Sequence, residues 1–226
     1  IDLSSGAKIL DVGCGEGRHI FGSLQAFKQA YCVGYDQHIP SLNICKDGLA
    51  FFQELDSGAT IFVQGSVYKL PFEDNSFDLI FCSEVLEHLD DYHLALDEIH
   101  RVLKSGGKFL PSVPSFWPEK ICWMLSIDYQ NMPGGHVRIF KKNQVISEIT
   151  NHGFVYEKSE RFHGLHSAYW WLRCIFWKTQ ESNWLVRQYK KFLEYQILQN
   201  PSWLKKIENC MNPLFGKSIA FYFQKK

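Results

Sequence analysis

The sequence predicts an α/β fold: a Rossmann-like, mostly parallel sheet of seven strands with helices on both faces. Short apolar runs such as 8–12, 31–35 and 60–64 recur along the first half of the chain, and segments with helical spacing separate them. Strands and helices that alternate in this way form parallel sheets. Because the runs are apolar on both faces, helices are expected to cover both sides of the sheet.

The order of the expected elements follows from this pattern. Strands are expected at 8–12, 31–35, 60–64, 77–83, 108–113, 154–161 and 218–224, and helices at 20–30, 40–54, 91–103 and 141–152. The strand at 218–224 alternates in polarity, as an edge strand would. Segment 115–140 is expected to be a flap over the carboxyl ends of the strands, irregular as far as Gly135 because of its Trp and Pro residues.

The last third of the chain holds a helical, aromatic-rich insertion, 163–216, before the final strand. Five of the seven Trp lie in it, and connections this long are usually functional or separately folded. Residues 168–177 suit either an apolar pocket or a membrane interface, and the open alternative is that the aromatic residues only pack the added helices. The expected organisation is a single domain, 1–226, with a cofactor-binding half at 1–114.

Composition excludes several classes of protein. Lys plus Arg and Asp plus Glu are both 24, so no basic surface is expected for nucleic acid. The seven Cys are scattered without a CxxC pair, which disfavours a disulfide framework or a zinc knuckle. His152, His163 and His166 have no ligand spacing with carboxylates or Cys, so no metal is expected. With no signal sequence or spanning segment, the expectation is a cytoplasmic protein, with contact at a membrane surface left open.

The strongest motif is the glycine-rich turn 11–17, DVGCGEG, between the first strand and the first helix. Glycines let the backbone approach a ligand, and the helix that follows presents free N–H groups. Arg18 stands where a dinucleotide-binding turn has its third Gly, which disfavours a nicotinamide-dependent oxidoreductase. Asp36 ends the second strand and suits a hold on two ribose hydroxyls. A ribose-bearing ligand is therefore indicated, and a pyrophosphate is less so.

Four motifs in order resemble a known family. ILDVGCGEGRH, GYDQ, LPFEDNSFDLIFCSEVLEHL and RVLKSGGKFLPSVPS closely resemble class I S-adenosylmethionine-dependent methyltransferases, in the methyltransferase type 11 group related to ubiquinone and menaquinone biosynthesis. The resemblance covers roughly residues 7 to 155. It implies S-adenosylmethionine as cofactor and S-adenosylhomocysteine as product.

The resemblance also implies roles for residues at the strand ends. Asp11, Gly13, Cys14 and Gly15 would hold the methionine end of the cofactor, Asp36 the ribose and Gln37 the adenine. Ser66 and Val67 match the position that meets adenine, although many relatives carry Asp where this chain has Ser66. Cys82, Ser83 and Glu84 would flank the methionine portion. The residue types also allow Cys14 and Cys82 to be small packing residues.

A sulfonium is already an activated methyl donor, so the protein mainly has to align the acceptor and exclude water. A base helps where the acceptor is a hydroxyl. His136 is the first candidate, because it matches a His-x-Arg segment of many relatives, and His88 is the second. The open alternatives are a structural tether for His136 and a local hydrogen bond at a helix start for His88.

The expected function is methyl transfer by in-line displacement to a small-molecule or lipid-like acceptor. O-methylation is favoured over C- or N-methylation. The alternative is a non-catalytic protein that binds S-adenosylmethionine and uses the aromatic insertion as a partner surface. The sequence does not predict the oligomeric state.

Overall fold

A computed structural model describes residues 3–27, 29–52 and 59–226. The strands are β1 (Lys8–Val12), β2 (Tyr31–Asp36), β3 (Thr60–Gln64), β4 (Phe77–Ser83), β5 (Leu103–Pro114), β6 (Phe154–Phe162) and β7 (Ser218–Lys225). They form one sheet of seven strands within the described residues, in the order β3-β2-β1-β4-β5-β7-β6. The pairs β1–β2, β1–β4, β2–β3 and β4–β5 are parallel, so the predicted mostly parallel sheet is confirmed.

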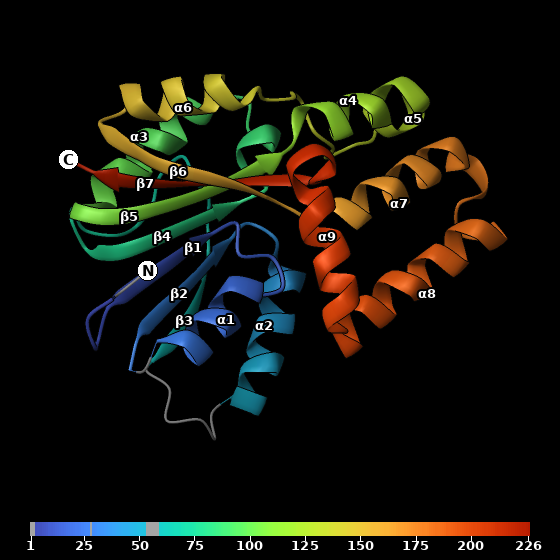
Figure 1. Cartoon of the computed structure of the whole chain (residues 1–226). Helices are drawn as coiled ribbons and strands as arrows, with labels where there is room; N and C mark the ends of the chain where they lie inside the picture. Colours follow the sequence, from blue (N-terminus) through green and yellow to red (C-terminus); the bar gives the residue numbers. More distant parts are fainter. Residues whose placement is uncertain (1–2, 28, 53–58) are drawn as a thin grey trace. The chain divides into compact units, whose positions relative to one another are not determined.

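Helices separate the strands. They are α1 (Arg18–Ala26), α2 (Ile39–Phe52), α3 (Tyr92–Val102), α4 (Phe116–Leu125), α5 (Ile127–Gln130), α6 (Lys142–Asn151), α7 (Gly164–Ile175), α8 (Trp184–Gln199) and α9 (Ser202–Phe215), with short 3₁₀ turns η1 (Leu86–His88) and η2 (Trp177–Thr179). Figure 1 shows α1 and α2 on one face of the sheet and α3 on the other. The expected end of the second helix, Glu54, lies outside the described residues.

The chain divides into two compact units. The sheet unit comprises the described residues of 1–112, 146–158 and 221–226, and the helical unit comprises 113–145 and 159–220. In the helical unit, α7 packs against α4, α8 and α9. No helix that the structure describes is long and apolar enough to cross a bilayer.

Apolar side chains on both faces of the central strands fix the core of the sheet unit. Ile9, Leu10, Leu79 and Ile80 on β1 and β4 are 0% exposed. On α1, Ile20 packs into the same cluster as Ile9 and Leu79. Burial on both faces is what the continuous apolar runs predict for parallel strands.

The prediction that 115–135 is irregular is wrong, because α4 and α5 occupy most of it. Pro118 is the third residue of α4, where its missing N–H would have no helical partner in any case. Ser126 ends α4 and then caps α5, where its hydroxyl accepts the Tyr129 N–H. The Trp and Pro residues that suggest a loop therefore occupy positions that a helix tolerates.

The prediction that the final strand lies at an edge is also wrong. β7 lies between β5 and β6, and its arrow runs opposite to that of β5 in Figure 1. Phe221 and Phe223 are 0% exposed, and Tyr222 between them is half-buried. The polarity of β7 alternates because one face is buried and the other is half-buried, and not because the strand lies at an edge of the sheet.

Candidate functional site

The glycine-rich turn joins β1 to α1 and bends over the end of β2. Gly13 has a φ of 72°, and a Cβ on it would lie 2.3 Å from Val85 Cγ2, so no other residue fits there without a shift. The N–H groups of Gly13 and Cys14 both donate to the Tyr35 carbonyl, at 2.7 and 3.1 Å. The turn is thereby fixed at the carboxyl edge of the sheet unit, where ligands bind in open α/β sheets.

Asp36, the last residue of β2, braces the turn. Its Oδ2 accepts the Gly15 N–H at 2.9 Å, and its Oδ1 accepts the His38 N–H at 2.8 Å. Each carboxylate oxygen can accept more than one hydrogen bond. Asp36 can therefore hold the turn and still accept hydrogen bonds from two hydroxyl groups of a ligand.

Asp11 is a fully buried acid of the sheet unit. It is 0% exposed, and neither carboxylate oxygen has a hydrogen-bond partner among the described residues. Burial, with a smaller contribution from the charge of Asp36, raises the pKa of Asp11 to about 7. A buried carboxylate without partners is rare in a native protein and suggests a missing ligand group, such as a cation.

The ends of β2 and β3 supply the next group of candidates. Gln37 is exposed, and its carbonyl accepts the Gln64 amide at 3.4 Å. The Ser66 carbonyl accepts the Tyr35 hydroxyl at 3.2 Å, and Val67 is half-buried. The Tyr35 hydroxyl thus fixes the loop after β3 beside the end of β2.

The end of β4 is tied to β5. The Ser83 and Ser112 hydroxyls lie 2.7 Å apart, and the Ser112 hydroxyl donates to Glu84 Oε1 at 3.0 Å. Cys82 is 0% exposed and Cys14 is 6% exposed, and burial raises the pKa of both thiols. Both thiols stay protonated, so neither is suited to act as a nucleophile.

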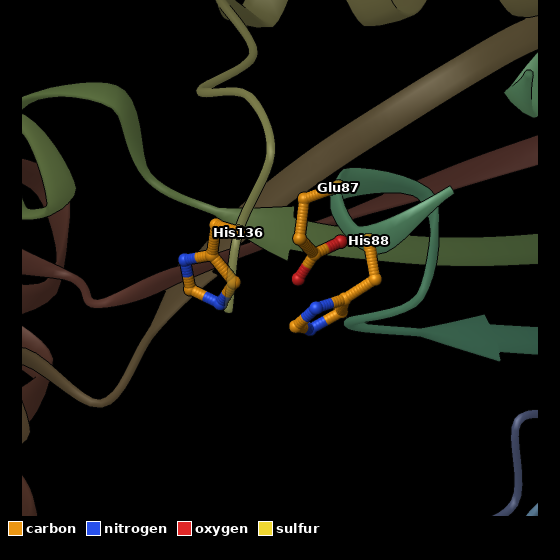
Figure 2. Close-up of side chains that lie close together, drawn as sticks. All are labelled: Glu87, His88 and His136. Atoms are coloured by element: carbon orange, nitrogen blue, oxygen red, sulfur yellow. The ribbon is translucent and has the colours of Figure 1, made fainter. Parts of the chain in front are cut away.

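The second candidate base follows β4 on η1. Glu87 and His88 extend from this turn, as Figure 2 shows. Glu87 is 0% exposed, whereas His88 is exposed. The His88 N–H donates to the Val85 carbonyl at 2.9 Å, which closes the turn.

The helical unit contains a buried polar cluster around Glu119, a residue of α4 that is 0% exposed. Its Oε1 accepts hydrogen bonds from the Tyr129 hydroxyl and from His136 Nδ1, each at 2.8 Å. Its Oε2 pairs with Lys217, which follows α9. His136, also drawn in Figure 2, keeps 17% of its side chain exposed.

The partners of Glu119 keep it ionised. Burial alone would raise the pKa of Glu119, but the hydrogen bond from His136 and the charge of Lys217 outweigh burial and lower it to about 2. Burial and the neighbouring Glu119 charge raise the pKa of Tyr129. Because an ionised carboxylate only accepts hydrogen bonds, Nδ1 of His136 carries a hydrogen.

Aromatic rings surround this cluster. Tyr129 packs with Cys122 and Cys174, against Trp123, Trp170, Trp171 and Trp177. The Lys217 ammonium lies 5.6 Å from the centre of the Trp170 ring, and the Trp171 indole N–H donates to the Pro118 carbonyl at 3.0 Å. Four of the seven Trp therefore pack within the helical unit, and three of them, Trp170, Trp171 and Trp177, belong to the insertion, which supports the packing interpretation for these three.

A second group in the helical unit brings His163, His166 and Glu208 together, with one possible ligand atom of each within 4.8 Å of the others. Glu208 Oε2 accepts a hydrogen bond from Gln196. Glu208 lies far from both His residues in the sequence, so the sequence shows no ligand spacing. The absence of a metal stays a prediction.

The structure thus brings the predicted cofactor residues of β1, β2, β3 and β4 to one edge of the sheet unit. It also reveals three residues of the His136 cluster that the sequence analysis missed: Glu119, Tyr129 and Lys217. No short-range spacing links them, since Glu119 and Lys217 are 98 positions apart.

Comparison with known proteins identifies the domain. Residues 10–110, which include the glycine-rich turn and the ends of β1 to β4, match the family model described as "Methyltransferase domain". They form a class I S-adenosylmethionine-dependent methyltransferase domain. The family resemblance predicted from the four motifs is thereby confirmed.

Two curated relatives resemble this methyltransferase domain. The chain is 37% identical over 109 residues to the sterol 24-C-methyltransferase ERG6B of Gibberella zeae, a match that covers 48% of this chain and 28% of the relative. It is 32% identical over 123 residues to the demethylmenaquinone methyltransferase of Staphylococcus epidermidis, covering 51% and 49%. The chain thus spans less than half the length of these relatives.

The fold also matches solved methyltransferase-like structures. The YcgJ protein of Bacillus subtilis has a TM-score of 0.62 and 20% identity, and the match covers 100% of this chain and 94% of that one. At this identity the likeness shows the fold alone.

S-adenosylmethionine is the cofactor of this family, and the residues at the sheet edge fit it. Its two ribose hydroxyls would match the acceptor oxygens of Asp36, and the ammonium group of its methionine end would give the buried Asp11 carboxylate a partner of opposite charge. The turn at Gly13 leaves room for close approach of the backbone.

Proposed function

We propose that this chain transfers the methyl group of S-adenosylmethionine to an oxygen atom of a small, apolar or lipid-like acceptor. The observation that carries the proposal is the buried Asp11 carboxylate, which has no partner in the described protein and lies at the edge braced by Asp36. When bound, the cofactor supplies an activated methyl group on a sulfonium. Alignment of the acceptor and exclusion of water then remain for the protein.

In this proposal, each strand end holds one part of the cofactor. Asp11, Gly13, Cys14 and Gly15 hold the methionine end, with Cys82, Ser83 and Glu84 beside it. Asp36 accepts hydrogen bonds from the ribose hydroxyls, and Gln37, Ser66 and Val67 border the adenine.

His136 is the proposed base for the acceptor hydroxyl, and Glu119 is the residue that positions it. The hydrogen bond from Nδ1 to Glu119 fixes the ring and makes Nε2 the nitrogen that takes up a proton. Lys217 and Tyr129 hold the Glu119 carboxylate in place. His88 on η1 is the second candidate for the base.

The names of the relatives support an apolar acceptor, since one acts on a sterol and another on demethylmenaquinone. The sterol relative is named for methylation at carbon, whereas the Glu119–His136 pair supports oxygen, because a base assists the methylation of a hydroxyl. We also propose peripheral contact with a membrane, in which such an acceptor would be dissolved.

A labelled-methyl assay tests this function. The chain is incubated with methyl-labelled S-adenosylmethionine and, separately, a fatty acid, a phenolic quinol and a sterol. The label in the organic phase is counted, and mass spectrometry with NMR locates the new methyl group. We expect label on an oxygen of one acceptor class. Cofactor binding without transfer to any acceptor would support the non-catalytic alternative, and a C-methyl product would contradict the proposed methylation of oxygen.

Matched variants separate the two bases. We expect His136→Gln to lower kcat by about 10²–10⁴-fold and to flatten the acidic limb of the pH–rate profile, with unchanged affinity for the cofactor. Glu119→Gln should lower kcat less and shift that limb, because it acts through His136. His88→Gln should keep the wild-type rate. Loss of rate in His88→Gln alone would assign the base to His88.

A further inference from the structure

The last two helices of the helical unit, α8 and α9, expose large apolar side chains. On α9, Leu204 is 1% exposed, whereas Trp203, Ile207 and Leu214 are 54%, 45% and 72% exposed. The three exposed residues are four and seven positions apart, so they lie along one side of the helix. α9 therefore presents an apolar stripe to solvent.

α8 repeats this arrangement. Val186 and Leu193 are 4% and 5% exposed and form its inner face. Trp184, Tyr195 and Leu198 are 63%, 49% and 78% exposed, and their spacing of eleven and three positions places them together on the opposite side. Apolar residues on the outer side of two neighbouring helices, with aromatic rings among them, are typical of a surface that binds another protein or a membrane.

The charges of the same helices are strongly biased. Segment 184–215 has five basic residues and two acidic ones, although the whole chain has a net charge of zero. The basic residues are all exposed: Arg187, Lys190, Lys191, Lys205 and Lys206. One of the two acids, Glu208, is half-buried, and burial raises its pKa. The exposed apolar stripes therefore lie in a positively charged segment.

We propose that the outer faces of α8 and α9 bind the surface of a bilayer that contains anionic lipids. Trp and Tyr rings favour the boundary between headgroups and acyl chains, and Lys and Arg are attracted to anionic headgroups. A second copy of the chain fits less well, because a symmetric contact would place the same positive charges against each other. The membrane contact of the proposed function is thereby assigned to the outer faces of α8 and α9 and to anionic lipids.

Vesicle co-sedimentation of the full chain tests it. Vesicles of phosphatidylcholine alone are compared with vesicles that also contain about one third phosphatidylserine. We expect binding to the anionic vesicles only, and weaker binding as salt is raised. The double variant Arg187→Glu/Lys191→Glu, at two exposed positions beside Trp184 and Leu198 on α8, should bind at least about 25-fold more weakly, since each basic residue contributes about fivefold. Trp203→Ser/Leu214→Ser and Trp184→Ser/Leu198→Ser should each lose most of the binding.

Two control variants lie in the sheet unit. Leu94→Ser removes an exposed apolar side chain of α3, and Lys46→Glu reverses an exposed charge of α2. Both should bind anionic vesicles as the wild type does. Every variant is also titrated with S-adenosylmethionine, because unchanged affinity shows that the sheet unit is folded, and circular dichroism shows that the helices of the helical unit remain.

Three results would overturn the inference: no binding to anionic vesicles at low salt, equal binding by the charge-reversed variant, or a wild-type dimer that the serine variants convert to monomers. The third result would assign the stripes to self-association. Failure here is distinguishable from failure of the proposed function, because vesicle binding needs neither cofactor nor methyl transfer.

Discussion

The sheet unit and the helical unit build their polar sites in different ways. In the sheet unit, Asp11 is the last residue but one of β1 and Asp36 is the last of β2, and the parallel topology alone brings both to one edge. In the helical unit, Glu119 and Lys217 meet although they are 98 positions apart. A site at strand ends is a property of the fold, whereas a site among packed helices depends on every contact that places them.

The two buried acids make the same contrast in electrostatic terms. Asp11 has no partner in the described protein, and its pKa is raised to about 7. Glu119 has three partners, and its pKa is lowered to about 2. The proposed role of the first acid toward a ligand comes at a cost in stability, whereas the second acid stabilises its unit.

The largest expected effect comes from removing the stabilising acid. Glu119→Ala leaves the Lys217 ammonium buried without its partner and should lower the free energy of unfolding by about 3–5 kcal/mol. Urea unfolding followed by Trp fluorescence measures this, since Trp170 and Trp177 lie beside the cluster. Glu181→Ala, at a side chain that is 89% exposed, is the control and should change stability by less than about 0.5 kcal/mol. If Glu119→Ala lowered the free energy of unfolding by as little as the control does, Glu119 would not stabilise the helical unit, and the contrast with Asp11 would be lost.

Asp11→Asn should act in the opposite direction. The folded-state pKa of Asp11 is raised, so the unfolded state loses its proton first and stability falls as pH rises from about 4 to about 7. Asn removes this cost, so at pH 8 the variant should be more stable by up to about 4 kcal/mol, and at pH 4 it should match the wild type. Thermal unfolding at both pH values is the check, and titration should show weaker binding of S-adenosylmethionine. A variant that is destabilised at pH 8 would show that Asp11 has a structural partner.

The contribution of Glu119 to the free energy of unfolding changes with pH in the opposite direction to that of Asp11. Its folded-state pKa is about 2, below its usual value of 4.5, so its contribution is present above about pH 4.5 and is lost as pH falls toward 2. The loss should be on the order of 3 kcal/mol. Urea unfolding of the wild type and of Glu119→Gln at pH 6 and pH 3 measures it. The gap between the two proteins should narrow at pH 3, and a constant gap would contradict the lowered pKa.

The smallest effect is expected at Gln37. Its side chain is exposed, and the contact that the structure shows is made by its backbone carbonyl, which survives substitution. Gln37→Ala should weaken binding of S-adenosylmethionine by no more than about fivefold, the worth of one neutral hydrogen bond. A loss of 100-fold or more in the titration would show that this side chain is a principal cofactor contact.

The sequence predicted the sheet unit well because its signals are local. The apolar runs mark the strands, the glycines of 11–17 mark the turn, and Asp36 follows directly from the second strand. The position of β7 was missed because alternating polarity does not distinguish an edge strand from one whose two faces differ in burial. α4 was missed because Pro118 signals a break except in the first turn of a helix.

The cluster around His136 could not be predicted to the same extent. His136 itself was singled out by its local motif, but its partners Tyr129, Glu119 and Lys217 become neighbours only when α4, α5 and the end of α9 pack. The outward stripes of α8 and α9 were also hidden. The sequence placed both helices in a helical, aromatic-rich insertion, without showing that Leu198 and Leu214 face solvent.

The central claim is that the edge of the sheet unit binds S-adenosylmethionine through Asp36, and calorimetric titration tests it most directly. The wild type is titrated with S-adenosylmethionine, S-adenosylhomocysteine and NADH, beside Asp36→Ala and the control Asp47→Ala, an exposed acid of α2. We predict binding of both adenosyl ligands but not of NADH, a loss of at least about 100-fold in Asp36→Ala, and no change in Asp47→Ala. Failure of both adenosyl ligands to bind, or equal binding by Asp36→Ala, would contradict the account.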